Sequence, residues 1–289
     1  MPEPRSARRR LRDALAGDEP VLAPLCLDPL TARLLTELGF TSGYASGGAL
    51  GFQYAVSEAL LTAGDVADVV RRITRRSDLA VIADGGVGFG DPVHVARAVW
   101  ELEESGAAAI EIEDQVAPKR VHHHVGVEHL VDTGTMVAKV EVAVAERRDP
   151  DLLIIARTGA VRHEGLEAAI DRLRAYRAAG ADMLMLFCST EQLATVADRI
   201  EGPFATITAL DRHPRAEWAS TGWALVIDAF AGQAVPLRAL REAYRRYLDE
   251  GTLGVDLAGM DLHRELVDLC GLQPLLDVER RTTERGEVA

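Results

Sequence analysis

The chain of 289 residues is 48% hydrophobic and 27% charged, which is typical of a globular protein and excludes a largely disordered one. Its 45 acidic and 32 basic residues give a net charge of −13, which argues against a nucleic-acid partner because phosphate binding requires the opposite sign. The apolar runs are too short to cross a membrane, and three widely spaced cysteines are typical of a reduced, cytoplasmic protein.

Arginines crowd the N-terminus, over residues 4–12. No apolar stretch follows them, so a secretory signal is not expected. Two interpretations stay open, a targeting peptide and the solvated, frayed start of a helix.

Short apolar runs alternate with helical patterns along the rest of the chain. Each run has the length of a strand and is too short for a helix. The eight predicted strands are Val21–Cys26, Ser42–Ser46, Ala80–Ala83, Ala108–Ile112, Leu152–Ala156, Met183–Phe187, Phe204–Ala209 and Ala224–Ala229.

Amphipathic segments lie between these runs. Leu166–Leu173 carries apolar residues at i, i+3, i+4 and i+7, which predicts a helix with one buried face. Asp91 and Pro92 indicate a helix start, with Asp at the N-cap and Pro at the first helical position. Three glycines mark places where helices should end: Gly39, Gly106 and Gly180.

Eight strand–helix units predict an α/β fold, a parallel (β/α)8 TIM-type barrel over residues 1–254. A doubly wound sheet with the same alternation is the alternative. Residues 255–289 are predicted to form a helical tail whose apolar stripe consists of Leu257, Met260, Leu266, Leu269 and Cys270. Because a closed barrel has no inner place for this stripe, we expect the tail to pack on a neighbouring subunit.

Polar residues follow the predicted strands at their carboxyl ends, where barrels of this kind have their active sites. They include the carboxylates of Asp84 and Glu113 and the guanidinium of Arg157. Mg2+ prefers oxygen ligands and keeps several waters, while arginine offers a fork to a substrate carboxylate or phosphate. These residues therefore predict a site for a hard cation and an anionic substrate. Salt bridges that merely close the top of the barrel are the alternative.

Five stretches carry a resemblance to a known family. Val81–Gly90 is similar to the pattern V-x-x-D-x-D-x-G-[YF]-G, and Ile110–Arg120 to I-x-I-E-D-Q-x-x-P-K-[RK]. Ile154–Thr158 matches I-x-A-R-T, Tyr44–Gly48 resembles Y-x-S-G, and Asp28–Ala32 resembles D-x-x-[ST]-A. In this order and spacing, the motifs resemble the isocitrate lyase / phosphoenolpyruvate mutase superfamily.

The resemblance implies a barrel whose last helix is exchanged between paired subunits, in a homotetramer built as a dimer of swapped dimers. It also implies Mg2+, with Mn2+ as the alternative ion, and a small 2-oxo or 2-hydroxy carboxylate that reacts through a metal-stabilised enolate. By position, Asp84 would be the direct metal ligand, while Glu113 and Glu58 would hold the waters of the metal. The substrate would be bound by Tyr44, Ser46, Gly47, Gly48 and Arg157.

The chain departs from the family pattern at three positions. Gly86 replaces the second aspartate of the strand-three motif, and Gly159 replaces the aspartate that follows A-R-T. Val121 stands where the lyases have the cysteine that acts as general acid and base. Isocitrate and methylisocitrate are therefore not the expected substrates. Loss of these polar groups predicts a bulkier, less anionic 2-oxo acid with an apolar substituent.

Histidines follow Val121 on the same loop. His123 takes the position of the family's own histidine, and histidine is a suitable acid or base near neutrality. Together with His122 and with Lys119 of the matched motif, it is a candidate catalytic residue. For the run His122–His124, a solvated surface and a transition-metal site are the alternatives.

We therefore predict a Mg2+-dependent carbon–carbon lyase or decarboxylase acting on a small carboxylate. A phosphonopyruvate-type mutase or hydrolase is the alternative within enzymes. A catalytically silent barrel used for binding or regulation is the alternative outside them.

Overall fold

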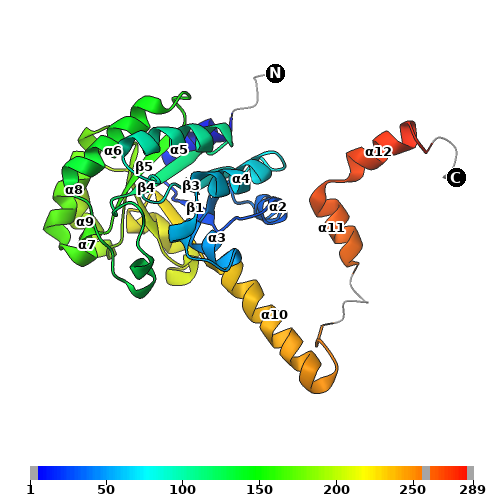
Figure 1. Cartoon of the computed structure of the whole chain (residues 1–289). Coiled ribbons are helices and arrows are strands. Elements are labelled where there is room, and N and C mark those ends of the chain that lie inside the picture. Colours follow the sequence, from blue (N-terminus) through cyan, green and yellow to red (C-terminus); the bar gives the residue numbers. More distant parts are fainter. Residues whose placement is uncertain (1–5, 256–260, 285–289) are drawn as a thin grey trace. The chain divides into compact units, whose positions relative to one another are not determined.

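Eight parallel strands form a ring in which each strand pairs with its neighbour along the chain (Figure 1). β1 pairs with β8 in register from Val21 opposite Leu225, and a bridge between Leu25 and Tyr44 links the first two strands. An open doubly wound sheet would leave two unpaired edges, so that alternative is wrong. The strands are β1 (Val21–Pro24), β2 (Ser42–Ala45), β3 (Ala80–Asp84), β4 (Ala109–Glu113), β5 (Leu153–Thr158), β6 (Met183–Leu186), β7 (Phe204–Ile207) and β8 (Leu225–Asp228).

The structure is a computed structural model that describes residues 6–255 and 261–284. The helices that connect successive strands lie around the ring of strands (Figure 1). The α-helices are α1 (Ala7–Leu15), α2 (Pro29–Glu37), α3 (Gly47–Gln53), α4 (Ala63–Thr74), α5 (Pro92–Glu104), α6 (Thr133–Glu146), α7 (Ala160–His163), α8 (Leu166–Ala178), α9 (Thr190–Ala197), α10 (Ala231–Glu250), α11 (Leu262–Cys270) and α12 (Gln273–Arg281). Short 3-10 helices are η1 (Glu58–Leu60), η2 (Val121–Val125), η3 (Leu210–Arg212) and η4 (Arg215–Thr221).

The predicted helix boundaries are confirmed. α5 begins at Pro92 directly after Asp91. Gly39, Gly106 and Gly180 follow α2, α5 and α8 with φ of 90°, 95° and 101°, a left-handed conformation that favours glycine.

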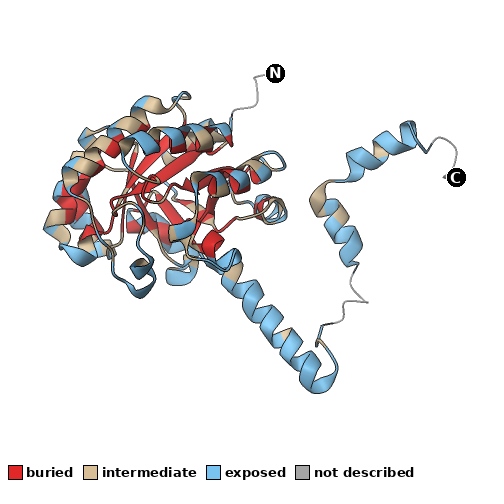
Figure 2. Cartoon of the chain, in the orientation of Figure 1, coloured by how far each residue is buried: buried red, intermediate tan, exposed pale blue. Residues whose placement is uncertain are grey.

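The strands separate two hydrophobic clusters, because alternate side chains of a strand point to opposite faces. On β3, Val81 and Ala83 pack outward against the helices, while Ala80 and Ile82 pack into the barrel interior. Figure 2 shows the buried residues gathered on the strands and on the helix faces that meet them. The interior is therefore a packed core, and polar groups are left to the strand ends.

Helix α1 closes one end of the barrel, contrary to the expectation of a solvated helix start. Leu11, 2% exposed, belongs to the interior cluster. Arg8 donates to the carbonyl oxygens of Ala107 and Glu103 at 2.8 and 2.6 Å, and Arg12 pairs with Asp182 at 2.9 Å. These N-terminal arginines contact residues that precede the barrel strands. The contacts attach the short helix to the amino end of the barrel.

Residues Met1–Gln233 and Ala234–Ala289 form two compact units. The second unit contains α10 from Ala234 onward, α11 and α12. None of these helices has a buried side chain in the isolated chain. Two residues of the predicted apolar stripe, Leu257 and Met260, lie outside the described residues. In the described ranges no helix is long and apolar enough to cross a membrane.

Candidate active site

Asp84 lies at the centre of a group of polar residues at the carboxyl ends of β2 to β5. Its Oδ2 accepts a hydrogen bond from Gly47 N at 2.8 Å, and its Oδ1 accepts one from Gly86 N at 2.9 Å. Ser46 caps α3 by accepting from Ala49 N, which presents Gly47 to Asp84. A Cβ at position 47 would lie 3.1 Å from Asp84 Oδ2, so glycine allows this close approach.

Lys119 joins two of the predicted metal-site carboxylates. Its Nζ lies 2.5 Å from Glu58 Oε1 and 2.5 Å from Glu113 Oε1. Burial opposes the charged ammonium, but Glu113, Glu58 and Asp84 outweigh it and raise the pKa of Lys119. The side chain is therefore a permanent cation within the cluster.

The carboxylates divide into two electrostatic classes. Burial opposes ionisation of all of them. For Glu58, hydrogen bonds from His123 and the charge of Lys119 prevail and lower its pKa to about 2. Arg157 and Lys119 likewise lower the pKa of Glu113. For Asp84, burial and then repulsion from Glu58 raise the pKa. Asp84 is thus the carboxylate with the greatest need of a further cation.

Glu111 is a buried functional residue that the sequence reasoning missed. It accepts a hydrogen bond from the Tyr44 hydroxyl at 2.6 Å and pairs with Arg157 Nη1 at 3.2 Å. Arg157 Nη2 lies 3.1 Å from Glu113 Oε2. Burial raises the pKa of Glu111 to about 7 against the pull of Arg157. An acidic residue within an apolar strand, between Ile110 and Ile112, was the available signal.

The histidine loop brings one histidine into the site. His123 Nε2 lies 2.7 Å from Glu58 Oε1, and its Nδ1 lies 2.7 Å from the carbonyl oxygen of Arg120. His124 is exposed and contacts Ser57 Oγ at 2.9 Å, whereas His122 is exposed and directed away from Glu58, with its ring 6.2 Å from that of His129. Within the described residues no cluster of histidine, cysteine or acidic side chains fits a transition-metal site.

Glu128, on the same loop, occupies the space that Gly159 leaves. A Cβ at position 159 would collide with Glu128 Oε2. The carboxylate of Glu128 pairs with His163 Nε2 at 3.3 Å. Gly159 has φ of −88°, which suits any residue, so its backbone does not require glycine, and its nearest obstacle is the flexible end of the Glu128 side chain. A carboxylate from the loop thus stands where the family pattern has an aspartate.

A divalent cation fits this donor set. Glu113 Oε1 is buried without a hydrogen bond of normal geometry, although Lys119 Nζ lies nearby. In residues 6–255 and 261–284, no three acidic, histidine or cysteine side chains converge on one point. This arrangement is compatible with an ion that takes only one or two carboxylate ligands directly and keeps several waters.

Comparisons with known proteins show the family of the chain. The model of the family described as phosphoenolpyruvate phosphomutase matches residues 11–248. The chain belongs to this family, within the isocitrate lyase / phosphoenolpyruvate mutase superfamily. The resemblance in the motifs is thereby confirmed.

Three proteins similar to this chain are named as enzymes of different activities: a lyase, a decarboxylase and a hydrolase. A probable 2-methylisocitrate lyase of Corynebacterium glutamicum is 43% identical over 68% of this chain, but the match spans only 62% of that relative, less than two thirds of its length. An oxaloacetate decarboxylase of Paraburkholderia xenovorans is 36% identical over 89% of this chain and 87% of its own length. The structure of a phosphonopyruvate hydrolase complex with oxalate and Mg++ superposes with a TM-score of 0.87 at 27% identity, over 96% of this chain and all of that one.

The contact between His123 and Glu58 predicts a pH-dependent loop. Although burial opposes the imidazolium, Glu58 raises the pKa of His123 above its ordinary value. The stabilisation is therefore complete below pH about 6.5 and is lost as the pH rises through the raised pKa. In metal-free protein, NMR titration should give a raised pKa that falls in Glu58→Gln and is unchanged in Glu104→Gln. An ordinary His123 pKa in the native protein would contradict the contact.

The fit between Gly159 and Glu128 predicts a non-additive pair. Gly159→Asp should lower the free energy of unfolding by about 1 kcal/mol or less, because the new side chain displaces the flexible carboxylate of Glu128 from its contact with His163. Combining it with Glu128→Ala should recover most of this loss in denaturant unfolding. Purely additive effects of the two substitutions would show that the side chains do not compete for one space.

Proposed function

We propose that the protein is a divalent-metal-dependent carbon–carbon lyase or decarboxylase for a small 2-oxo or 2-hydroxy carboxylate. The observation that carries the proposal is the buried cluster of Asp84, Glu58 and Glu113 beside the Arg157 guanidinium. Burying so many charges costs stability, and a function that uses these charges would explain why they are buried. The lyase and decarboxylase relatives support this reaction class.

Arg157 and the turn that begins α3 are proposed to bind the substrate carboxylate. Ser46, Gly47 and Gly48 form this turn beside Asp84, and a Cβ at position 48 would lie 3.2 Å from Glu58 Oε2. Arg157 is held by Glu111 and Glu113 and lies over the Phe187 ring, 4.9 Å from its centroid. Tyr44 acts indirectly, since its hydroxyl donates to Glu111.

Proton transfer is proposed for His123, and charge stabilisation for Lys119. The pKa of Lys119 is raised, so its ammonium supplies positive charge and is a poor base. His123 is half-buried, its Nε2 faces the cluster at Glu58, and an imidazole exchanges protons readily near neutrality. His122 is exposed, and we propose that it is a structural residue of the loop that does not contact the substrate.

Asp84, Glu58 and Glu113 would hold the cation, which we propose to be Mg2+, with Mn2+ as a substitute. Bound there, it would supply the positive charge that stabilises an enolate oxygen. We place this activity in the cytoplasm, which is consistent with three free cysteines. The hydrolase likeness keeps phosphonopyruvate-type chemistry as the second candidate, because it shares the fold and is bound to oxalate and Mg++.

Removing Asp84 tests the metal-dependent reaction. Asp84→Ala should reduce Mg2+-dependent turnover of 2-oxo and 2-hydroxy acids at least 100-fold, since one buried electrostatic contact to the reacting groups is worth about that much. Circular dichroism should show an intact fold, and the exposed Asp198→Ala should retain activity. Full activity of Asp84→Ala, or of native protein in excess chelator, would contradict the proposal. Absence of turnover in the native protein for every acid tried would favour a silent barrel.

The tail, together with α10 before it, is proposed to pack on a second copy of the chain. Along α10, Leu237, Leu240, Tyr244 and Leu248 recur at helical spacing and are 52%, 52%, 60% and 83% exposed. Such a stripe is stable in water only against a partner surface, and symmetric pairing is the commonest arrangement. We infer a homo-oligomer, with the exchanged helices of a dimer of swapped dimers as the specific form.

Truncation after Gly251 tests this assembly. The shortened chain should aggregate or lose cooperative unfolding, because the apolar stripe of α10 loses its partner. Light scattering and thermal unfolding would measure both effects beside the full chain. A well-folded monomer of the truncated chain would contradict the exchange of helices.

A further inference from the structure

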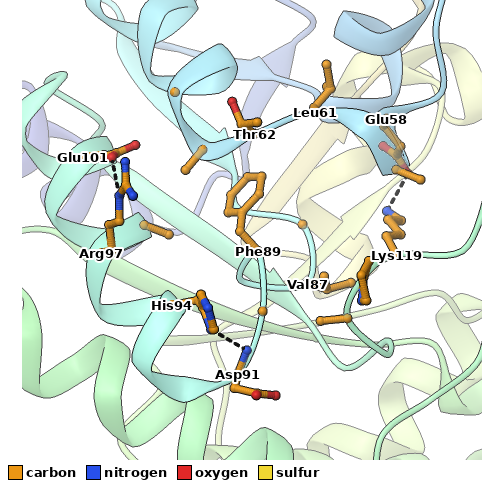
Figure 3. A pocket seen from close by; sticks show the side chains of 18 residues that line it. Glu58, Leu61, Thr62, Val87, Phe89, Asp91, His94, Arg97, Glu101 and Lys119 are labelled. Atoms are coloured by element: carbon orange, nitrogen blue, oxygen red, sulfur yellow. Dashed lines mark hydrogen bonds and ion pairs between the residues drawn. The ribbon is translucent and has the colours of Figure 1, made fainter.

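A side pocket of about 750 Å3 opens next to the carboxylate cluster (Figure 3). It lies between η1 and the start of α4 on one side and the β3–α5 loop with α5 on the other. Its size falls in the range of small-molecule sites. None of the roles proposed above uses this space.

Gly86 connects the side pocket with the site. Its N donates to Asp84 Oδ1 at 2.9 Å, and the residue also lines the pocket. A Cβ at position 86 would meet nothing within 4 Å, so a side chain there would project into open space. Glu58 and Lys119 complete the inner wall. The glycine at the family's aspartate position therefore leaves open space next to the residue that holds Asp84.

The middle of the side pocket is apolar. Leu61, Val87, Phe89 and Ala98 line it. Phe89 has φ of 57°, a left-handed conformation that is strained for a bulky residue and that clusters at functional sites. Figure 3 shows its ring between the Glu58–Lys119 pair and the outer end of the pocket. This surface favours a hydrocarbon group.

Arg97, the arginine that lines the outer end, has its own partner there. Arg97 Nε pairs with Glu101 Oε1 at 2.8 Å, and Asp91 N donates to His94 Nδ1 at 3.1 Å. The side pocket thus offers no uncompensated cation for a second or third substrate carboxylate. A tricarboxylate such as isocitrate gains nothing there.

We propose that the side pocket receives an apolar arm of the substrate, an alkyl or aryl group of several carbons on a 2-oxo or 2-hydroxy acid. The inference rests on the proposed function, because the acid end must bind at Arg157 and Asp84. The arm passes Gly86 and lies against Leu61 and Phe89. Each methylene buried on this path should tighten binding about threefold to fourfold.

Calorimetry with straight-chain 2-oxo acids tests the proposal without requiring turnover. Pyruvate, 2-oxohexanoate and 2-oxooctanoate are titrated into the full-length protein saturated with Mg2+. In the native protein, affinity should rise with each methylene until the side pocket is filled. Two variants obstruct the path: Gly86→Asn, whose side chain tolerates the left-handed backbone, and Leu61→Glu, which places a charge on the apolar wall.

Leu61→Glu should bind pyruvate within twofold of the native protein, and both variants should lose the dependence on chain length relative to their own affinity for pyruvate. Gly39→Asn is the matched control, since Gly39 also has positive φ and open space around it but lies outside the pocket. It should keep the native dependence. A native affinity that does not increase with chain length, or an unchanged dependence in both variants, would overturn the side-pocket proposal alone. Failure of every acid to bind, pyruvate included, would overturn the proposed function and this inference together.

Discussion

The structure depends on an imbalance of charge buried at the carboxyl ends of the strands. Four carboxylates, those of Asp84, Glu58, Glu111 and Glu113, surround two permanent cations. When all four are ionised and His123 is neutral, two negative charges remain in excess, and water is largely absent to screen them. Burial and repulsion raise the pKa of Asp84 and burial that of Glu111, so the cluster resists full ionisation. One divalent cation would cancel the excess.

This imbalance also organises the loop that covers the site. Lys119 is drawn between Glu58 and Glu113, and His123 is held against Glu58 by the same attraction. Glu128, farther along the loop, is engaged with His163 beside Gly159. The loop is thus attached to the barrel by charged contacts at both ends of its histidine run. A change in the charge of the cluster therefore changes the electrostatic environment of His123, the residue that we assign to proton transfer.

Much of this could be predicted from the sequence, because the relevant signals are local. All eight strands were found, since an apolar run of strand length needs no tertiary information. The motifs placed Asp84, Glu113 and Arg157 on adjacent strand ends, where the barrel brings them together. Alternation of side chains could also have identified Glu111, but a single acid in an apolar strand is easily taken for part of a motif.

Other features arise from contacts between distant segments and left no local pattern. The collision between Glu128 and a side chain at position 159 joins a loop to the end of β5. For the arginines of α1, a targeting peptide and a solvated helix start both stayed open, since their carbonyl partners near residues 103–107 are remote in sequence. His122 and His123 are indistinguishable by type, and only the turn of η2 directs one of them toward Glu58.

A crystal structure with Mn2+ and oxalate, recorded at the manganese absorption edge, tests the central claim most directly. The buried negative excess predicts one anomalous peak bonded to an Asp84 carboxylate oxygen, with Glu58 and Glu113 within reach of its waters and oxalate facing Arg157. An empty cluster in which Lys119 still bridges Glu58 and Glu113, with manganese bound elsewhere, would contradict the account.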